Sequence, residues 1–230
     1  MSIFPEWRRP TRTFLSDTDP YFSSVSLLLH MNGSNASTTF TDSSSNNLSC
    51  TVQGNAKLGT AQYKFGTASA DFTSAGALQA PNNNTVLSLT NDFTLEFWVY
   101  QTGTGSSYDT VVSDASSTSL IIRGSGSSPG IFVTGSSSNI ANTLTFANNT
   151  WHHIAVCRAS GTYKAFKDGT DITTATITNT ATLSLALFSI GKDTQYGRNF
   201  VGYVDEFRLT VGVARYAANF TPPTAPFPDF

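Results

Sequence analysis

WHHIAVCRASGTYKAFKDG, from Trp151 to Gly169, is the stretch of sequence that decides the fold. It is followed by SIG at 189–191 and by FVGYVDEFRL at 200–209, and each piece reads as a strand or a hairpin turn. Asp168-Gly169 lies between two apolar and aromatic runs and is a strong hairpin signal, because both central residues of such a turn must reach positive φ. The sequence therefore predicts a ladder of antiparallel strands.

Similar short runs of β-branched and aromatic residues recur from Val25 onward, separated by clusters of Ser, Asn, Gly and Thr. This spacing is typical of a β-sandwich or barrel rather than of alternating strands and helices. The predicted strands are 25–31, 48–52, 62–65, 68–72, 77–80, 93–101, 110–114, 118–123, 130–134, 139–146, 151–158, 162–167, 183–190 and 200–210.

The segment 93–99 alternates cleanly between two faces of a strand. Thr94, Glu96 and Trp98 share one face. The other face is apolar and is predicted to lie in the core; it carries Phe93, Leu95, Phe97 and Val99.

The order of these pieces resembles the laminin G-like, or concanavalin A-like lectin and glucanase, jelly-roll family. In that family a Trp-His-His-x-Ala-like strand, a strand ending in Asp-Gly, a Leu-x-x-x-x-Ile-Gly strand and a Gly-x-x-Asp-Glu-x-Arg strand follow one another. Earlier pieces fit as well, namely LLLHMNG at 27–33, KFG at 64–66 before ADF at 70–72, and DFTLEFWV at 92–99. The resemblance implies an all-β fold, an antiparallel two-sheet β-sandwich over residues 25–220. This superfold hosts glycan binders, protein binders and hydrolases alike.

The two ends of the chain differ from this pattern. Residues 1–24 are rich in proline and arginine and show no strand or helix period, so they read as an extended arm, either disordered or docked on another subunit through Phe4, Trp7 and Phe14. Residues 221–230 read as a proline-rich tail.

Composition narrows the classes of function. The chain has 230 residues, of which 12% are charged, and a formal net charge of −2 with its basic residues scattered, so nucleic acid is not an expected partner. No stretch has the ~20 apolar residues that a membrane span requires, nor the apolar run of a signal peptide, so membrane insertion is not expected. A protein of this kind that acts outside a cell would leave it by lysis or within a particle.

The segment Gly212-Val-Ala-Arg-Tyr-x-x-x-Phe220-x-Pro-Pro resembles the end of laminin G-like domains in bacteriophage structural proteins. The resemblance implies a non-enzymatic virion protein that decorates the capsid or sits on the tail. Its partners would be other virion structural proteins and host-surface polysaccharide, and we expect a homo-oligomer. The alternative is a carbohydrate-binding module or a glycan hydrolase on the same scaffold.

Residues for catalysis are sparse. Hydrolases of this superfold set carboxylates on alternate positions of one strand so that an acid and a nucleophile face one sugar. The glutamates here are Glu6, Glu96 and Glu206, and none lies in such an array, so we predict that the protein is not an enzyme. His152 and His153 are adjacent and point to opposite faces of a strand, which excludes a chelating pair.

The two cysteines, Cys50 and Cys157, lie inside apolar strand patterns. We predict that they are buried free thiols, with a single disulfide as the alternative, because a core of this size needs no covalent cross-link.

Asp205 is predicted to share one face of a regular strand with an apolar row, Val201, Tyr203, Phe207 and Leu209. A buried carboxylate must have a cation, a basic side chain or several backbone amides as its partner. In the resembled family this aspartate and the residue before Gly in the first strand often bind calcium, which implies a Ca²⁺ site at Asn32, Gly33 and Asp205. The alternative is an Asp205 held by backbone hydrogen bonds, Arg208 or Lys64.

Carbohydrate binding requires exposed aromatic rings beside polar side chains, because a ring stacks on a sugar while the polar groups take its hydroxyls. Candidates in loop-like segments are Tyr108, Asp109, Tyr196, Arg198 and Asn199. The alternative is that each is an ordinary exposed turn residue.

Overall fold

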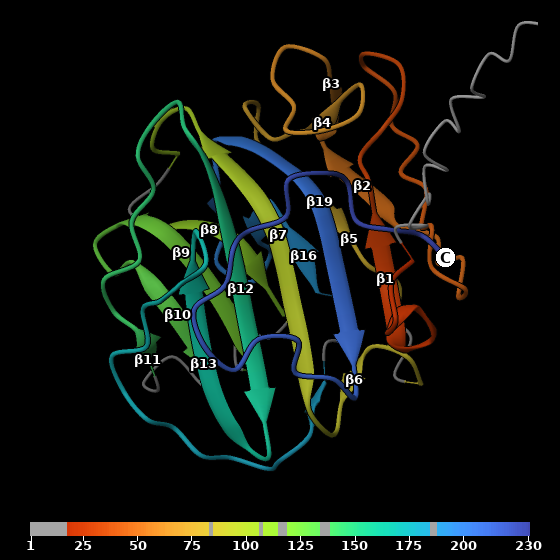
Figure 1. Cartoon of the computed structure of the whole chain (residues 1–230). Coiled ribbons are helices and arrows are strands. Elements are labelled where there is room, and N and C mark those ends of the chain that lie inside the picture. Colours follow the sequence, from red (N-terminus) through yellow and green to blue (C-terminus); the bar gives the residue numbers. More distant parts are fainter. Residues whose placement is uncertain (1–17, 83–84, 106–107, 115–118, 134–138, 185–187) are drawn as a thin grey trace, which may run out of the picture.

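The computed structural model describes residues 18–82, 85–105, 108–114, 119–133, 139–184 and 188–230. Two antiparallel sheets stack face to face, with β12, β7 and β19 in front and β8 and β9 behind in Figure 1. The predicted all-β, two-sheet sandwich is confirmed. The first sheet has the order β14 (Thr170–Asp171), β13 (Thr162–Lys167), β12 (Trp151–Ala159), β7 (Phe93–Gln101), β19 (Gly202–Val211), β4 (Ser69–Asp71) and β3 (Lys57–Gly59), and β1 (Val25–Leu29) also pairs with β19.

The second sheet has the order β11 (Asn139–Ala141), β10 (Gly130–Val133), β9 (Leu120–Gly126), β8 (Tyr108–Ser113), β16 (Ser189–Ile190), β5 (Gly76–Gln79) and β2 (Thr51–Gly54). Two short two-stranded sheets complete the described strands, β6 (Ser88–Leu89) with β15 (Leu183–Ser184) and β17 (Lys192–Asp193) with β18 (Arg198–Asn199). A 3₁₀ turn, η1 (Phe22–Ser24), precedes β1.

The core between the sheets is built as the alternation at 93–99 predicted. Phe93, Leu95, Phe97 and Val99 are all fully buried. Phe97 stacks against Phe207 of β19 with ring centres 5.8 Å apart, which joins the two central strands on the core side. Large aromatic rings of this kind contribute much of the apolar area that a sandwich core buries.

The turn at Asp168-Gly169 also forms as predicted. Both residues have positive φ, 50° and 77°, and the turn joins β13 to β14. A side chain at Gly169 would collide with the backbone of Phe220, so this glycine serves the C-terminal segment as well as the turn.

Three predicted strands are corrected by the structure. Residues 62–65 are not a strand, because the N–H groups of Lys64 and Phe65 bind the side chain of Asp205 instead of a neighbouring strand, and β3 lies earlier, at Lys57–Gly59. The predicted strand 139–146 ends at Ala141, where the chain turns. The predicted strand 183–190 is two short strands in different sheets, β15 and β16.

The face assignment of Asp205 is also wrong. In β19 the pairing with β7 shifts between Asp205 and Arg208, and Glu206 has a φ of 49°, which is a β-bulge. The extra residue turns Phe207 to the core, whereas Asp205 points to the outer face with Tyr203. The bulge also marks where β19 changes partner from β4 to β1.

The outer face of the first sheet is covered by the last residues of the chain. In Figure 1 this segment crosses in front of β12, β7 and β19 and ends beside β1. Phe227 is 3% exposed and packs with Val25 and Leu28, while Tyr216 and Phe220 pack over Phe166. We call residues 212–230 the C-terminal strap. The predicted tail at 221–230 therefore packs as part of the domain.

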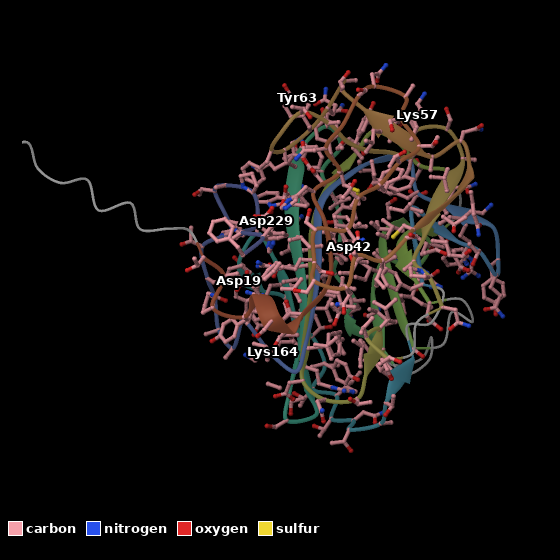
Figure 2. The ribbon with its side chains drawn as sticks, turned by 90° about the vertical axis from the view of Figure 1, so that its right-hand side faces the viewer. Asp19, Asp42, Lys57, Tyr63, Lys164 and Asp229 are labelled. Atoms are coloured by element: carbon pink, nitrogen blue, oxygen red, sulfur yellow. The ribbon has the colours of Figure 1, made fainter. Side chains whose placement is uncertain are left out.

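The start of the described chain lies against the same face. Asp19 donates its backbone N–H to the carbonyl of Phe230 at 3.0 Å. Figure 2, a view turned by 90°, shows Asp19 and Asp229 on the same side of the two layers. Of the predicted arm, residues 18–24 thus belong to the domain, and Phe4, Trp7 and Phe14 lie outside the described residues.

Both cysteines are free, as predicted. Burial raises the pKa of Cys50 to about 12 and that of Cys157 to about 11, so neither thiol is activated at neutral pH.

Candidate functional site

The pair β17 and β18 brings several of the predicted binding residues together. This short hairpin follows Gly191, where a side chain would collide with the ring of Phe72, and it contacts β8. Its turn is fixed by Asp193, whose Oδ1 accepts the N–H groups of Gln195 and Tyr196, both at 3.1 Å. As a result Arg198 contacts both Tyr196 of the same hairpin and Tyr108 at the start of β8.

Arg198 is the centre of this contact. Its guanidinium carbon lies 4.3 Å from the ring centre of Tyr108 and 4.4 Å from that of Tyr196. The side chain is 24% exposed, and one nitrogen lies 3.6 Å from Asp193 Oδ2. Tyr196 is 59% exposed, so one ring of the cluster is open to solvent. Planar cationic groups stacked on aromatic faces are held rigidly while their edges stay free to donate hydrogen bonds.

A second arginine, which the sequence did not single out, extends the cluster. Arg123 of β9 lies 5.2 Å from the ring centre of Tyr108 and 4.9 Å from that of Phe132 in β10. It is 4% exposed, and its Nε has no hydrogen-bond partner among the described residues. Burial, together with repulsion from Arg198, lowers the pKa of Arg123. We call Tyr108, Arg123, Phe132, Tyr196 and Arg198 the aromatic–arginine cluster.

The signal for Arg123 was present in the alternation of β9. Leu120 and Ile122 face the core, so Ile121 and Arg123 must face outward. What the sequence did not show is that this outward arginine meets a hairpin some seventy residues later in the chain.

Asp109 and Asn199, also predicted as binding residues, hold the backbone around the cluster or lie beside it. Asp109 is fully buried; its Oδ1 accepts the N–H of Gly105 at 2.7 Å and its Oδ2 accepts the hydroxyl of Ser125. It is therefore turned inward and fixes the loop after β7. Asn199 is half-buried, and its Oδ1 has no donor among the described residues.

The residues predicted to bind calcium converge on the loop 64–67. Asp205 Oδ2 accepts the N–H groups of Lys64 at 2.7 Å and Phe65 at 3.1 Å, and Oδ1 accepts that of Glu206 at 2.9 Å. Asn32 Oδ1 accepts the N–H of Thr67 at 2.7 Å. Burial raises the pKa of Asp205 to about 7, although the N–H groups of Phe65 and Lys64 act in the opposite direction.

This arrangement does not fit a calcium ion, which favours six to eight oxygen ligands. N–H groups, which would repel a cation, face the oxygens of both side chains, and the described residues contain no group of three acidic, His or Cys side chains around one point. Asp205 is instead held by backbone hydrogen bonds from Lys64 and Phe65, which is one of the alternatives given for it in the sequence analysis. Calcium binding stays a prediction, and the melting temperature with added calcium and then with EDTA tests it.

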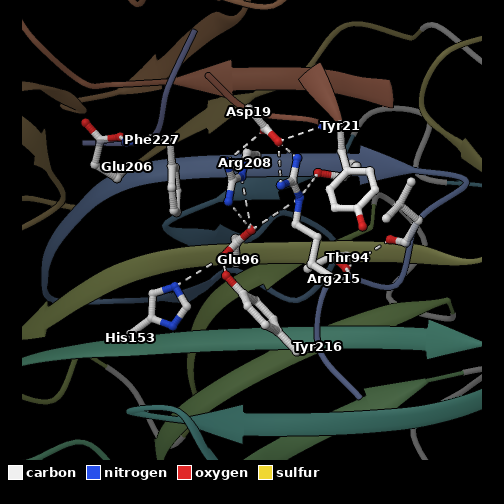
Figure 3. A network of polar contacts seen from close by, with 12 residues as sticks. Asp19, Tyr21, Thr94, Glu96, His153, Glu206, Arg208, Arg215, Tyr216 and Phe227 are labelled. Atoms are coloured by element: carbon white, nitrogen blue, oxygen red, sulfur yellow. Dashed lines mark hydrogen bonds and ion pairs between the residues drawn. The ribbon is translucent and has the colours of Figure 1, made fainter. Parts of the chain in front are cut away.

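A second polar cluster lies beneath the C-terminal strap (Figure 3). Glu96 Oε1 accepts two hydrogen bonds from Arg208, at 2.8 and 3.0 Å, and Oε2 accepts the hydroxyl of Tyr216 at 2.8 Å and lies 3.3 Å from His153 Nε2. Asp19 joins Arg208 to Arg215, with oxygen-to-nitrogen distances of 2.6 to 3.1 Å. These residues are the buried ion-pair network.

The network keeps Glu96 ionised and out of reach. Burial alone would raise the pKa of Glu96, but Arg208, His153 and Tyr216 together lower it to about 2. Glu96 is fully buried and Glu206 is 1% exposed. Glu206 in turn accepts the N–H of Phe227 and pairs with His30 Nδ1, both at 2.9 Å. Both described glutamates thus fasten the strap to the sheet.

A hollow of about 370 Å³ lies at the opposite end of β7 from the aromatic–arginine cluster. Arg158 lines it, yet this side chain is 1% exposed and donates to the carbonyls of Leu89, Asn91 and Ala181 and to the Tyr163 hydroxyl. The arginine therefore joins loops within the domain and offers no free donor.

The remaining histidine, His152, is fixed inside the domain. Its Nδ1 lies 2.7 Å from Asp168 Oδ2, and its Nε2 accepts the N–H of Ala147. In the described part of the chain, no helix is long and apolar enough to cross a membrane.

The sequence and the fold of this chain are similar to those of known proteins. A family model described as the concanavalin A-like lectin/glucanases superfamily matches residues 72–213, more than half of the chain. The chain belongs to this superfamily. None of the curated protein sequences compared with the chain matches it.

Solved structures of similar fold include domain 4 of AbnA, a GH43 extracellular arabinanase from Geobacillus stearothermophilus, in complex with arabinotriose. It is 19% identical with a TM-score of 0.63, and the match covers 83% of this chain and 94% of that domain. Botulinum neurotoxin type C, whose cell entry depends on interaction with two ganglioside molecules, is 13% identical with a TM-score of 0.58. The binding domain of botulinum neurotoxin serotype G is 12% identical with a TM-score of 0.56.

The matches with the two toxins cover 83% and 86% of this chain but 48% of each toxin chain, so this superfamily domain spans about half their length. At these identities the similarity shows the fold alone.

Proposed function

We propose that this domain binds carbohydrate through the aromatic–arginine cluster. The observation that carries the proposal is the exposed ring of Tyr196 stacked on Arg198, beside Tyr108. A tyrosine ring open on one side can stack on the apolar face of a sugar, and a guanidinium beside it can donate to the sugar's hydroxyls. Domain 4 of the arabinanase, which shares this fold, is solved with arabinotriose, and this supports the proposal.

We propose further that the domain is not an enzyme. Glycosidases need two carboxyl groups that reach the same sugar. Glu96 and Glu206 are at most 1% exposed and accept hydrogen bonds from arginine, tyrosine and backbone groups, and Asp205 is fully buried as well. A glycan hydrolase on this scaffold remains the alternative, and release of reducing ends from a bound polysaccharide would establish it.

Affinity electrophoresis in gels containing host polysaccharide tests the binding proposal. Tyr196→Ala should abolish the retardation of the protein in such gels, because it removes the exposed ring. Tyr63→Ala is the matched control, since Tyr63 is 47% exposed and comes from a different loop. Equal retardation of wild type and Tyr196→Ala would refute the assignment of the site.

We also propose that the domain is displayed on a phage particle, attached to other virion proteins through residues 1–17 and assembled as a homo-oligomer. The low content of charged residues and the resemblance of residues 212–223 to phage domains support this setting. The same residues have an internal use, because Arg215 and Tyr216 bind Asp19 and Glu96. The motif at residues 212–223 can therefore be explained by the packing of the strap as well as by a place in a virion.

Removal of residues 1–17 tests the particle proposal. The truncated protein should fold and should be missing from purified particles, because the aromatic anchors Phe4, Trp7 and Phe14 are gone. Particles that carry the truncated protein at full occupancy would refute the role of the arm, and sedimentation of the purified protein would give its oligomeric state.

A further inference from the structure

We propose that the saccharide bound at the aromatic–arginine cluster is acidic, and that its carboxylate is held by Arg123 and Arg198. This inference rests on the proposed function and names its ligand class. It begins with an incompletely satisfied group, because Arg123 is 4% exposed and its Nε has no acceptor among the described residues. Asp193, the carboxylate that acts on the charge of Arg123, also pairs with Arg198. A buried donor without an acceptor is costly, so its place in a fold indicates an acceptor that arrives from outside.

The position of Arg123 directs that partner to the cluster. The guanidinium carbon of Arg123 lies 5.2 Å from the ring centre of Tyr108. The guanidinium carbon of Arg198 lies 4.3 Å from the same ring centre. The two arginines are close enough for Arg198 to lower the pKa of Arg123. Two like charges at one surface repel each other, and an anion between them would relieve that repulsion.

Among the described residues, the carboxylate that acts on both of these arginines is that of Asp193. Asp193 pairs with Arg198 at 3.6 Å and is fully buried, and its Oδ1 holds the hairpin turn. Asp109 is turned inward toward Gly105 and Ser125. The Asp193 carboxylate is thus shared by two guanidinium groups.

The chemistry of the side chains selects a carboxylate on a ring. The planar fork of a guanidinium matches the two oxygens of a carboxylate, and the paired hydrogen bonds are stronger than those to a neutral hydroxyl. The open ring of Tyr196 beside it suits a ligand that joins this carboxylate to an apolar ring face. Uronic acids and sialic acids have both parts, whereas neutral sugars bring no negative charge to the arginines.

Two matched pairs of probes test the ligand class. Tetragalacturonate is compared with its methyl ester, and 3′-sialyllactose with lactose, by titration of the full chain and observation of tyrosine ring and arginine side-chain NMR signals. We expect the acidic member of at least one pair to bind about tenfold more tightly than its neutral partner, the change expected for one charge-assisted hydrogen bond. The signals of Tyr108 and Tyr196 should shift on binding.

The arginine variants assign the preference to the cluster. Arg123→Gln and Arg198→Gln should each reduce the preference for the acidic over the neutral member of a probe pair to about onefold. Lys164→Gln is the control for loss of one positive charge, because this lysine is 40% exposed and lies in β13, away from the cluster. Thermal melts of each variant check that it folds, and the wild-type comparison of paired probes stands even where a variant does not.

The outcomes separate this inference from the proposed function. Binding of acidic and neutral members with equal affinity would overturn the inference and leave carbohydrate binding intact. Failure of all four probes to shift the tyrosine signals would count against both. An oligonucleotide of eight thymidines that bound as tightly as the acidic sugars would also overturn the inference, because it would show unspecific attraction of anions and bases.

Discussion

At the scale of single residues, Glu96 joins Arg208 on the outer face of the first sheet to Tyr216 of the C-terminal strap. Glu96→Gln keeps the shape of the side chain but removes one of the two buried carboxylates that pair with Arg208, the other being Asp19. We expect a loss of about 3 to 5 kcal/mol in the free energy of unfolding, as is typical when one partner of a buried pair is removed. Chemical denaturation measures it, and Lys164→Gln, at an exposed pair, should change stability by less than about 0.5 kcal/mol.

The same residue gives the stability a defined dependence on pH. The pKa of Glu96 is about 2 in the folded state against 4.5 as its ordinary value. Because the folded pKa is the lower one, its stabilising effect is complete above pH 4.5 and disappears as the pH falls toward 2. The stability difference between wild type and Glu96→Gln, measured from pH 7 to pH 3, should therefore shrink below pH 4.5. A difference that stays constant to pH 3 would contradict this.

At the scale of elements, the C-terminal strap covers the outer face of the first sheet, as a helix or a further sheet does in other folds. It covers the outer face of the first sheet with Tyr216, Phe220 and Phe227, and Phe227 lies under the guanidinium of Arg208 at 3.9 Å. A sheet with charged residues on its outer face usually leaves them in water. Here the strap buries them, which is why they must be paired.

Phe227→Ala should show how much the strap contributes. Removal of a ring that is 3% exposed should lower the free energy of unfolding by about 3 to 5 kcal/mol. Phe230→Ala, three residues later, removes a ring that is 62% exposed and should have an effect below about 0.5 kcal/mol. Equal effects of the two changes would mean that the strap does not stabilise the sheet.

At the scale of the whole molecule, the two ends of the described chain close on one another over the first sheet. Asp19 bonds to the backbone of Phe230 and pairs with both Arg208 and Arg215. Asp19, which the sequence placed in the arm, is therefore part of the fold, and we expect the domain boundary to lie before Asp19 rather than at residue 25.

Two truncations test the boundary. A chain that starts at residue 18 should unfold at the same denaturant concentration as the full protein. A chain that starts at residue 25 lacks Asp19, and the two arginines lose their shared carboxylate, so its free energy of unfolding should fall by about 2 to 5 kcal/mol. Equal stability of the two truncated chains would place the boundary back at residue 25.

The sequence alone was sufficient for most of the longer strands, for the core face of β7 and for the turn that depends on neighbours in the chain. Alternation placed Phe93 to Val99 correctly because a strand has a fixed period of two, and Asp168-Gly169 predicted its turn because the backbone conformation it needs is local. Three of the candidate binding residues lie together in the structure, because Arg198 contacts both Tyr108 and Tyr196, and their role in binding stays a prediction.

Only the tertiary structure decided the rest. The bulge at Glu206 reversed the face assignment of Asp205, because a single inserted residue exchanges the two faces of every residue beyond it. Arg123 joined the cluster, and Asp19 paired with Arg208, through contacts between residues up to 189 positions apart. Local sequence carries the conformation of each strand, whereas burial and charge pairing between distant segments depend on how the finished sheets and the strap come together.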